Sequence, residues 1–272
     1  MNYRHAFHAG NFADCVKHAL LVWLLRALAR KPAAFAVLDT HAGAGRYDLT
    51  AFPAGHTGEW RAGIFRLHDD PPAELADYVG LVRALGLYPG SPALARALLR
   101  PQDRLICCEL HPEEAAELRR HFARDGQTSV HHRDGWEALG ALLPPKERRG
   151  LVLIDPPYEQ PDEFFRVLAG LRAGHARFGT GVFAVWYPIK HRAPVRALHD
   201  ALRGSGIVDI VAAELWLREP LDAARLNGCG LIVVNPPYRF EPEGLIILRA
   251  LLARLGEGRE GEGCAMLRLA DE

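Results

Sequence analysis

The sequence has few cysteines, and their arrangement excludes two kinds of stabilised scaffold. Only five occur in 272 residues, at Cys15, Cys107, Cys108, Cys229 and Cys264. The number is odd and no pair has the C-x-x-C spacing, so neither a disulfide framework nor a zinc knuckle is indicated. No other metal-ligating cluster stands out. We therefore expect no metal site, and a reducing, cytoplasmic location by default.

Long apolar runs are also missing. The most apolar stretch, residues 19–29, is interrupted by Arg26 and is too short to span a bilayer. It also lacks the small-residue cleavage pattern of a signal peptide. We expect no membrane association.

An excess of either charge is missing as well, because 33 lysines and arginines balance 33 aspartates and glutamates. This balance disfavours a protein that binds nucleic acid only through general positive charge. Locally the charges are uneven: residues 1–31 carry five cations against one acid, and residues 190–203 carry four against one. Such clusters are usually solvated helix faces. The alternative is a track for phosphates.

The most informative motif is Asp155-Pro156-Pro157-Tyr158, which follows the apolar run Leu151–Ile154. Two prolines make the end of this predicted strand rigid. The Asp155 carboxylate and the Pro156 carbonyl can accept two protons of an exocyclic amine, while the Tyr158 ring can stack on a planar base. Alone, the motif is equally compatible with an ordinary strand-ending turn.

A glycine-rich turn supports the functional interpretation. The predicted strand Phe35–Leu38 leads into Asp39-Thr40-His41-Ala42-Gly43-Ala44-Gly45-Arg46. Asp48 stands where a dinucleotide-binding motif would have its third glycine, which disfavours a dinucleotide. S-adenosylmethionine needs no pyrophosphate cradle and suits this turn better.

Two further acids complete a pattern. Glu109 ends the predicted strand Arg104–Glu109, where it can bind two ribose hydroxyls, and Asp134 follows a strand near residues 129–132, where it can accept an adenine amine. Each acid alone is more typical of a helix cap or a turn. In open α/β sheets, however, ligands bind at the carboxyl ends of strands, and Asp39, Glu109, Asp134 and Asp155 are all predicted there.

Several strings resemble one known family. They are Tyr3-Arg4-His5-Ala6-Phe7-His8-Ala9-Gly10-Asn11 with Asp14 and Lys17-His18, Leu38–Tyr47, Tyr88–Pro92, Glu109–Pro112, Arg149–Asp155 and Trp186-Tyr187-Pro188. Together they resemble the RlmJ family of 23S rRNA adenine-N6 methyltransferases, across nearly the whole chain except the tail after Gly256. The tetrapeptide is shared by many amino-methyltransferases, whereas the N-terminal string is much more specific.

The resemblance implies roles for individual residues. It implies S-adenosylmethionine as cofactor and 23S rRNA as partner, with a monomeric enzyme. The implied catalytic residues are Asp155, Pro156, Pro157 and Tyr158. The implied cofactor-binding residues are His18, His41, Gly43, Ser91, Glu109, Asp134, Gly135 and Asp155. Tyr3 and Arg4 are implied to face the RNA.

The predicted architecture is an α/β, Rossmann-like class I methyltransferase fold, for which the resemblance implies a mainly parallel seven-stranded sheet. Gly45 and Glu109 are 64 positions apart, whereas the ribose acid usually follows the glycine turn by about 20. We therefore expect an inserted helical subdomain at 48–100, within a methyltransferase domain formed by 1–47 and 101–272. A long amphipathic helix from Phe12 to Arg30, capped by Asn11, should precede the first strand.

A second tetrapeptide, Asn235-Pro236-Pro237-Tyr238, also follows an apolar run, Leu231–Val234. An asparagine can accept a hydrogen bond but cannot take a proton as an aspartate can. We assign Asn235 to a structural strand exit. Three functions remain open: an rRNA adenine-N6 methyltransferase, a DNA adenine or protein amino-group methyltransferase, and a non-catalytic RNA-binding assembly factor. The first is favoured by the N-terminal string, and the third has no need of Asp155.

Overall fold

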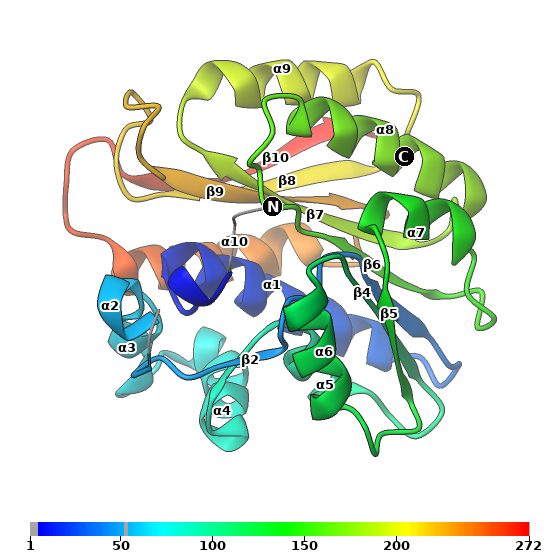
Figure 1. Ribbon diagram of the computed structural model, residues 1–272. Helices are drawn as coiled ribbons and strands as arrows, with labels where there is room; N and C mark the ends of the chain where they lie inside the picture. Colours follow the sequence, from blue (N-terminus) through cyan, green and yellow to red (C-terminus); the bar gives the residue numbers. More distant parts are fainter. Residues whose placement is uncertain (1–4, 52–53, 272) are drawn as a thin grey trace.

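The computed structural model describes residues 5–51 and 54–271, and it is built around one sheet covered by helices on both faces (Figure 1). The strands are β1 (Ala36–Asp39), β4 (Arg104–Glu109), β5 (Thr128–His132), β6 (Gly150–Ile154), β7 (Val182–Ile189), β8 (Ile210–Trp216), β9 (Gly228–Val234) and β10 (Gly263–Ala270). Their order across the sheet is β10-β8-β9-β7-β6-β1-β4-β5.

The neighbouring strands β5, β4, β1, β6 and β7 are all parallel to one another, whereas β9 and β10 run in the opposite direction. β1 pairs in parallel with β4 and β6, and β7 pairs with β6 in parallel but with β9 antiparallel. The mainly parallel Rossmann-like sheet is confirmed, but the expected count of seven strands is wrong. The eighth strand, β10, pairs antiparallel with β8 at the sheet edge. This strand lies in the tail after Gly256, where the resemblance to the family is weakest.

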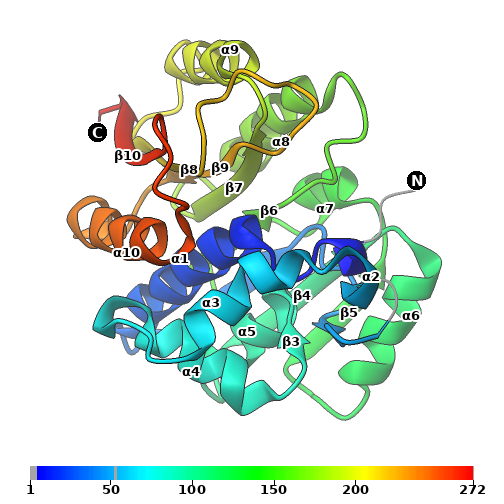
Figure 2. The same cartoon turned by 90° about the vertical axis from the view of Figure 1, so that its left-hand side faces the viewer.

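Buried strand residues alternate between two hydrophobic clusters, because successive side chains point to opposite faces of a sheet. Val37 and Leu105 belong to one cluster, and Leu38 and Cys108 to the other. The first cluster packs under α1 (Phe12–Ala29), α5 (Ser91–Leu98) and α10 (Phe240–Leu255). The second packs under α7 (Gly135–Ala141), α8 (Glu163–Arg177) and α9 (Arg192–Arg203), as Figure 2 shows from the side.

The first helix has nearly the predicted bounds and the predicted cap, but it is buried on most sides, so the expected amphipathic character is wrong. α1 begins after Asn11, whose side chain accepts a hydrogen bond from the Asp14 backbone N–H at 3.0 Å. This cap satisfies one of the backbone donors that a helix leaves free at its first turn. The helix is buried along most of its length, so its first turn is held firmly beside the carboxyl ends of the strands.

The segment 48–100 is mainly helical. It contains α2 (Ala54–Thr57), η2 (Glu59–Ala62), α3 (Ile64–His68), η3 (Ala73–Leu75), α4 (Ala76–Leu85) and α5, and its short strand β3 (Tyr88–Pro89) pairs with β2 (Arg46–Tyr47). Leu67, Leu75 and Tyr78 pack in the same cluster as α1. Its division from the rest of the chain as a subdomain stays our interpretation. α6 (Pro112–His121) lies between β4 and β5.

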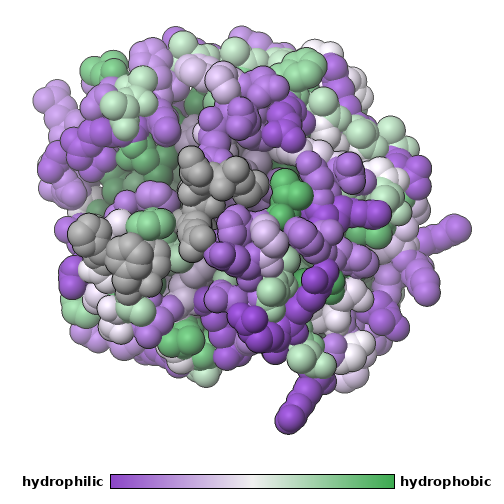
Figure 3. All heavy atoms as spheres, in the orientation of Figure 1, coloured by the Kyte–Doolittle hydropathy of each residue, from purple (hydrophilic) through white to green (hydrophobic). Residues whose placement is uncertain are grey.

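Hydrophilic residues dominate the face seen in Figure 1, and hydrophobic ones are scattered among them (Figure 3). The described residues include no helix that is both long and apolar enough to cross a membrane.

Candidate active site

A cavity of about 720 Å³ lies at the carboxyl ends of β1, β4, β6 and β7. This volume is within the range of pockets that bind small molecules and cofactors. Its walls come from the start of α1, the turn after β1, the segments after β4, β5 and β6, and the end of β7. Segments far apart in the sequence therefore meet here because parallel strands end at the same edge.

Glu109 joins the glycine turn to the end of β4. It is only 6% exposed, its Oε2 accepts the Gly43 N–H at 2.8 Å, and its Oε1 accepts the His111 N–H at 2.6 Å. Each carboxylate oxygen can accept more than one hydrogen bond. Glu109 can thus bind the backbone N–H groups of Gly43 and His111 and still accept hydrogen bonds from the hydroxyl groups of a ligand in the cavity.

Two glycines in this wall are required by close packing. Gly43 has a φ of +60°, and a Cβ there would lie 2.3 Å from the Tyr47 hydroxyl. A Cβ at Gly135 would lie 2.3 Å from the Thr40 carbonyl oxygen. The N-terminus of α7 can therefore approach the turn after β1 only because residue 135 is a glycine.

Asp134 caps α7, since its Oδ1 accepts the Trp136 N–H at 2.7 Å. Asp134 therefore has the helix-capping role that is common for an acid at the start of a helix. Asp134 also lines the cavity, together with His41 and Trp136, whose rings meet at 5.3 Å between centroids. Burial lowers the pKa of His41 to about 4, so this imidazole is neutral at pH 7.

Asp39 lies beneath the cavity floor. It is 1% exposed, and its Oδ2 accepts a hydrogen bond from the Ser91 hydroxyl at 2.6 Å. Burial raises the pKa of Asp39 to about 7, because the charged form is disfavoured away from water. Ser91 itself lines the cavity, so Asp39 is in contact with a cavity residue without lining the cavity.

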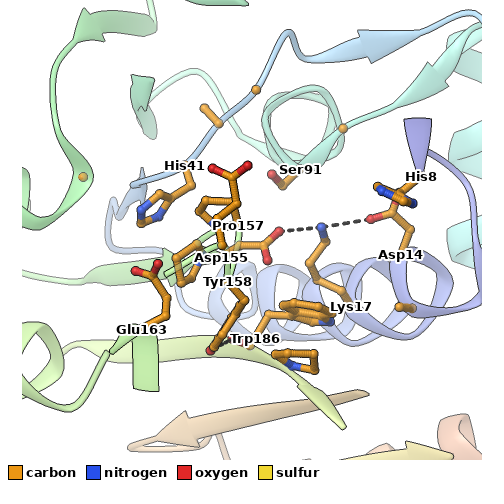
Figure 4. Close-up of a pocket in the computed structure, with 18 of the residues that line it drawn as sticks. His8, Asp14, Lys17, His41, Ser91, Asp155, Pro157, Tyr158, Glu163 and Trp186 are labelled. Carbon is orange, nitrogen blue, oxygen red and sulfur yellow. Dashed lines mark hydrogen bonds and ion pairs between the residues drawn. The ribbon is translucent and has the colours of Figure 1, made fainter. Parts of the chain in front are cut away.

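An ammonium group lies between two carboxylates at the centre of the site. Lys17 Nζ donates to Asp155 Oδ2 at 2.6 Å and forms an ion pair with Asp14 Oδ1 at 2.9 Å (Figure 4). Burial alone lowers the pKa of Lys17, but the charges of Asp14 and Asp155 outweigh it and leave the pKa raised. Lys17 is therefore charged, and it fixes the position of the Asp155 carboxylate.

Tyr158 forms the wall next to Asp155. Its backbone has a φ of +51°, which is rare for a residue with a side chain. Its hydroxyl donates to the Trp186 carbonyl at 2.7 Å, and its ring lies 5.7 Å from the Trp186 ring. The tyrosine is therefore held against β7 in a defined orientation that borders the cavity.

His18 is fully buried in α1, where its Nδ1 lies 3.0 Å from the Tyr88 hydroxyl. It also lines the cavity. The structure thus brings together His18, His41, Gly43, Ser91, Glu109, Asp134, Gly135, Asp155, Pro156, Pro157 and Tyr158, and all of them line one cavity. Tyr3 and Arg4 lie outside the described residues.

Asn235 lies at the opposite end of the strands from the cavity. β9 runs antiparallel to β7, so its end pairs with the beginning of β7. The Asn235 side chain donates to the carbonyls of Gly179 and Gly181 at 2.9 and 2.8 Å. The second tetrapeptide therefore ties β9 to the turn before β7.

The sequence model of the family described as "Ribosomal RNA large subunit methyltransferase D, RlmJ" matches residues 32–265. Two relatives, each called Ribosomal RNA large subunit methyltransferase J, come from Escherichia coli and Haemophilus influenzae. They are 42% and 41% identical to this chain, and in each case the match covers 94% of both sequences. The chain belongs to the RlmJ family.

A solved structure shares the fold of this RlmJ-family chain. The crystal structure of a Legionella pneumophila protein superposes on the chain with a TM-score of 0.88 at 35% identity. The match covers 96% of this chain and 98% of that protein. The whole fold, including the segment 48–100, therefore has a close counterpart in an experimental structure.

The sequence did not reveal the partner of Asp155 in this RlmJ-family site. Lys17 occurs in the N-terminal string, one turn after Asp14, but its contact with Asp155 joins residues 138 positions apart. The available signal was a lysine and an aspartate spaced i, i+3 at the start of a largely apolar helix. A buried pair of this kind needs further hydrogen-bond partners for its remaining donors and acceptors, but the pattern does not say which residues supply them.

Proposed function

We propose that this RlmJ-family chain transfers a methyl group from S-adenosylmethionine to N6 of a specific adenine in 23S rRNA. One observation carries the proposal. The tetrapeptide Asp155–Tyr158 faces the same cavity as the Glu109 and Asp134 carboxylates. An amine-binding motif and a nucleoside-binding set of acids therefore share one space of sufficient volume. The two curated relatives, named as large-subunit rRNA methyltransferases, support an rRNA substrate.

The residues present fit S-adenosylmethionine. Glu109 supplies buried carboxylate oxygens that can accept hydrogen bonds from ribose hydroxyls, and Asp134 can accept a hydrogen bond from the adenine amine. Gly43 lets a ligand approach the backbone after β1, and the neutral His41 and Ser91 add polar contacts. The many carboxylates favour a cationic ligand. When bound, the cofactor supplies an electrophilic methyl group on its sulfonium.

Asp155 orients the substrate amine. The N6 lone pair is delocalised into the adenine ring, so the amine is a poor nucleophile. Hydrogen bonds from the two amine protons to the Asp155 carboxylate and the Pro156 carbonyl increase electron density on the nitrogen and hold it in line for transfer. After transfer, Asp155 accepts the surplus proton.

Lys17 holds Asp155 for this role. The Lys17 ammonium donates to Oδ2 of Asp155. The carboxylate is thereby held in one orientation, and its remaining lone pairs can accept hydrogen bonds from the amine. Tyr158 and Trp186 bound the space beside it, so the Tyr158 ring can stack on the adenine. Pro157 keeps the segment rigid. Tyr3 and Arg4 are proposed to contact the RNA by stacking and charge.

A DNA adenine or protein amino-group methyltransferase would use the same tetrapeptide, but family membership favours RNA. A non-catalytic assembly factor would have no need of an Asp155 carboxylate fixed by a buried lysine. We also propose that the enzyme acts as a monomer in the cytoplasm, where rRNA is made in bacteria. Sedimentation of the purified chain tests the first of these two statements, and fractionation tests the second.

The decisive experiment uses 23S rRNA from cells that lack the gene. Incubation with the wild-type chain and S-adenosylmethionine should place N6-methyladenosine at one position, which is mapped by digestion and mass spectrometry. The same position should lack the modification in the deletion strain and carry it in the parent. Methylation of DNA but not rRNA, or no methyl transfer at all, would overturn the proposed function.

A further inference from the structure

The cavity is strongly acidic, and this creates a difficulty for an RNA substrate. Among the residues that the structure describes, three lysine or arginine side chains line it, at Lys17, Arg166 and Lys190. Eight carboxylates do: Asp14, Glu59, Glu109, Glu114, Asp134, Asp155, Glu159 and Glu163. RNA carries one negative charge per phosphate, and cationic side chains normally position its backbone. A cation at this cavity that binds a phosphate would offset the repulsion between the carboxylates and the RNA backbone.

Two of the three cations are already engaged. Lys17 contacts both Asp14 and Asp155. Arg166 forms an ion pair with Glu163 at 3.3 Å and lies over the Trp136 ring at 5.4 Å. Lys190 is exposed, and no carboxylate lies within ion-pair distance of its ammonium in the part of the chain that the structure describes. Its charge is therefore available to a phosphate.

Lys190 lines the cavity together with residues of the proposed adenine site. It directly follows β7, in which side chains alternate between the two faces of the sheet. Trp186 and Pro188 line the cavity with it, and the Trp186 carbonyl binds the Tyr158 hydroxyl. Lys190 thus has the same parity along the chain as Trp186, which contacts Tyr158 at the proposed adenine site.

The backbone of Lys190 is fixed on one side by Asn227. The Asn227 side chain is 1% exposed and donates to the Lys190 carbonyl at 2.7 Å and to the Asp222 carbonyl at 2.8 Å. The Asn227 N–H donates to the Ile189 carbonyl at 3.0 Å. These bonds join the end of β7 to the segment before β9.

On the other side, Arg192 fixes the chain. Its guanidinium donates to the buried Glu214 at 2.9 Å and lies over the Trp216 ring at 4.2 Å. Arg192 therefore serves the fold, although it belongs to the same basic stretch, residues 190–203. Within that stretch, Lys190 is the residue that lines the cavity. The anchored backbone therefore holds Lys190 at the cavity, while its side chain stays exposed.

We propose that Lys190 binds a phosphodiester group of the rRNA next to the target adenine. This assignment rests on the proposed function, because it supposes that the substrate is a polyanion whose base enters the cavity. Lys190 is a substrate-binding residue that holds the backbone while Asp155 and Tyr158 engage the base. Binding of S-adenosylmethionine does not depend on it.

The test compares Lys190→Ala, Lys190→Glu and Lys190→Arg with the wild type, using 23S rRNA from cells that lack the gene. Lys31→Ala is the matched control, because Lys31 is also exposed but precedes the amino end of β1. For Lys190→Ala we expect KM for rRNA to rise about tenfold with kcat within about twofold. The salt dependence of RNA binding should weaken by about 0.7–0.9 in the slope of log K against log salt.

Lys190→Glu should raise KM further, and Lys190→Arg should retain most of the wild-type affinity. Calorimetry should give the same affinity for S-adenosylmethionine in all variants, which also reports that each one folds. An active wild type with unchanged KM and salt slope in Lys190→Ala, or an equal effect of Lys31→Ala, would overturn the assignment to Lys190. A wild type that transfers no methyl group to rRNA would instead refute the proposed function.

Discussion

At the scale of single residues, the site depends on how buried charges are paired. Lys17 is 4% exposed, and a lone ammonium in such a place would be strongly destabilising. Its two carboxylate neighbours offset that cost and leave Asp155 partly facing the cavity, with 14% of its side chain exposed. The residue proposed to bind the amine is therefore held in place before any substrate arrives.

Asp155→Ala should abolish methyl transfer, because no carboxylate then orients the amine or accepts its proton. Affinity for S-adenosylmethionine should remain within about tenfold, since the variant keeps the Glu109 and Asp134 carboxylates. Methyl-transfer assays and calorimetry measure the two effects. Asn235→Ala is the control from the second tetrapeptide. It should lower the melting temperature, because the Asn235 side chain bonds two carbonyls, but retain turnover. Turnover by Asp155→Ala would contradict the mechanism.

Asp39 should make stability depend on pH. Burial raises its pKa from 3.8 to about 7 in the folded chain, so the folded state keeps a proton that the unfolded chain has released. The stability associated with this protonation is fully present below about pH 4 and is lost as the pH rises to about 7.

Asp39→Asn removes this titration. Relative to wild type, its free energy of unfolding should therefore increase between about pH 4 and about pH 7, by at most about 4 kcal/mol. Urea denaturation at both pH values measures the difference. Parallel pH dependence in the two proteins would show that Asp39 is ionised in the folded state.

At the scale of elements, the site depends on close approach between helix N-termini and strand ends. α7 begins at Gly135 directly against the turn after β1, and α1 presents Lys17 from its second turn. The first approach is fixed by backbone packing and the second by the ion pair between Lys17 and Asp155. Small changes in helix position should therefore alter the cavity.

Gly135→Ala should displace α7, because the new Cβ would lie 2.3 Å from a backbone oxygen. We expect a loss of about 1–3 kcal/mol in stability and weaker binding of S-adenosylmethionine. Gly140→Ala is a matched control in the same helix, where a Cβ meets no atom of the described structure within 4 Å. It should leave binding unchanged and raise stability by up to about 1 kcal/mol. Thermal melts and calorimetry distinguish the two, and equal behaviour would contradict the packing argument.

At the scale of the whole molecule, the cavity joins distant parts of the chain. Its lining extends from His8 to Leu226 and includes residues of the segment 48–100 such as Glu59 and Ser91. A ligand bound there contacts several segments at once and binds only the folded state. Ligand binding should therefore be linked to global stability.

S-adenosylmethionine at about 100 times its Kd should raise the free energy of unfolding by about 2.7 kcal/mol. The melting temperature should increase accordingly in a thermal scan. Glu109→Gln at the same ligand concentration should show a smaller increase, because one hydroxyl acceptor is replaced by an amide donor and about 1–3 kcal/mol of binding is lost. An equal increase in both proteins would remove Glu109 from the proposed ribose site.

Local patterns were sufficient to predict much of the fold. An acid after each of four predicted strands suggested the strand ends, and Asp39, Glu109, Asp134 and Asp155 do lie at or just after the ends of β1, β4, β5 and β6. Asn11 predicted the start of α1. The strand β10 was not predicted, because its pairing with β8 depends on a sheet edge that exists only after folding.

The sequence by itself determined which side chains are candidates for the proposed chemistry, because strand-ending acids, a glycine turn and the Asp155 tetrapeptide are all local features. Only the tertiary structure decided how they are paired. Strand direction placed Asn235 at the opposite end of the strands from the cavity, and helix packing brought Lys17 to Asp155. It also placed the exposed Lys190 at an acidic cavity. These contacts join residues far apart in the chain, and no local pattern encodes which distant group will neutralise a buried charge.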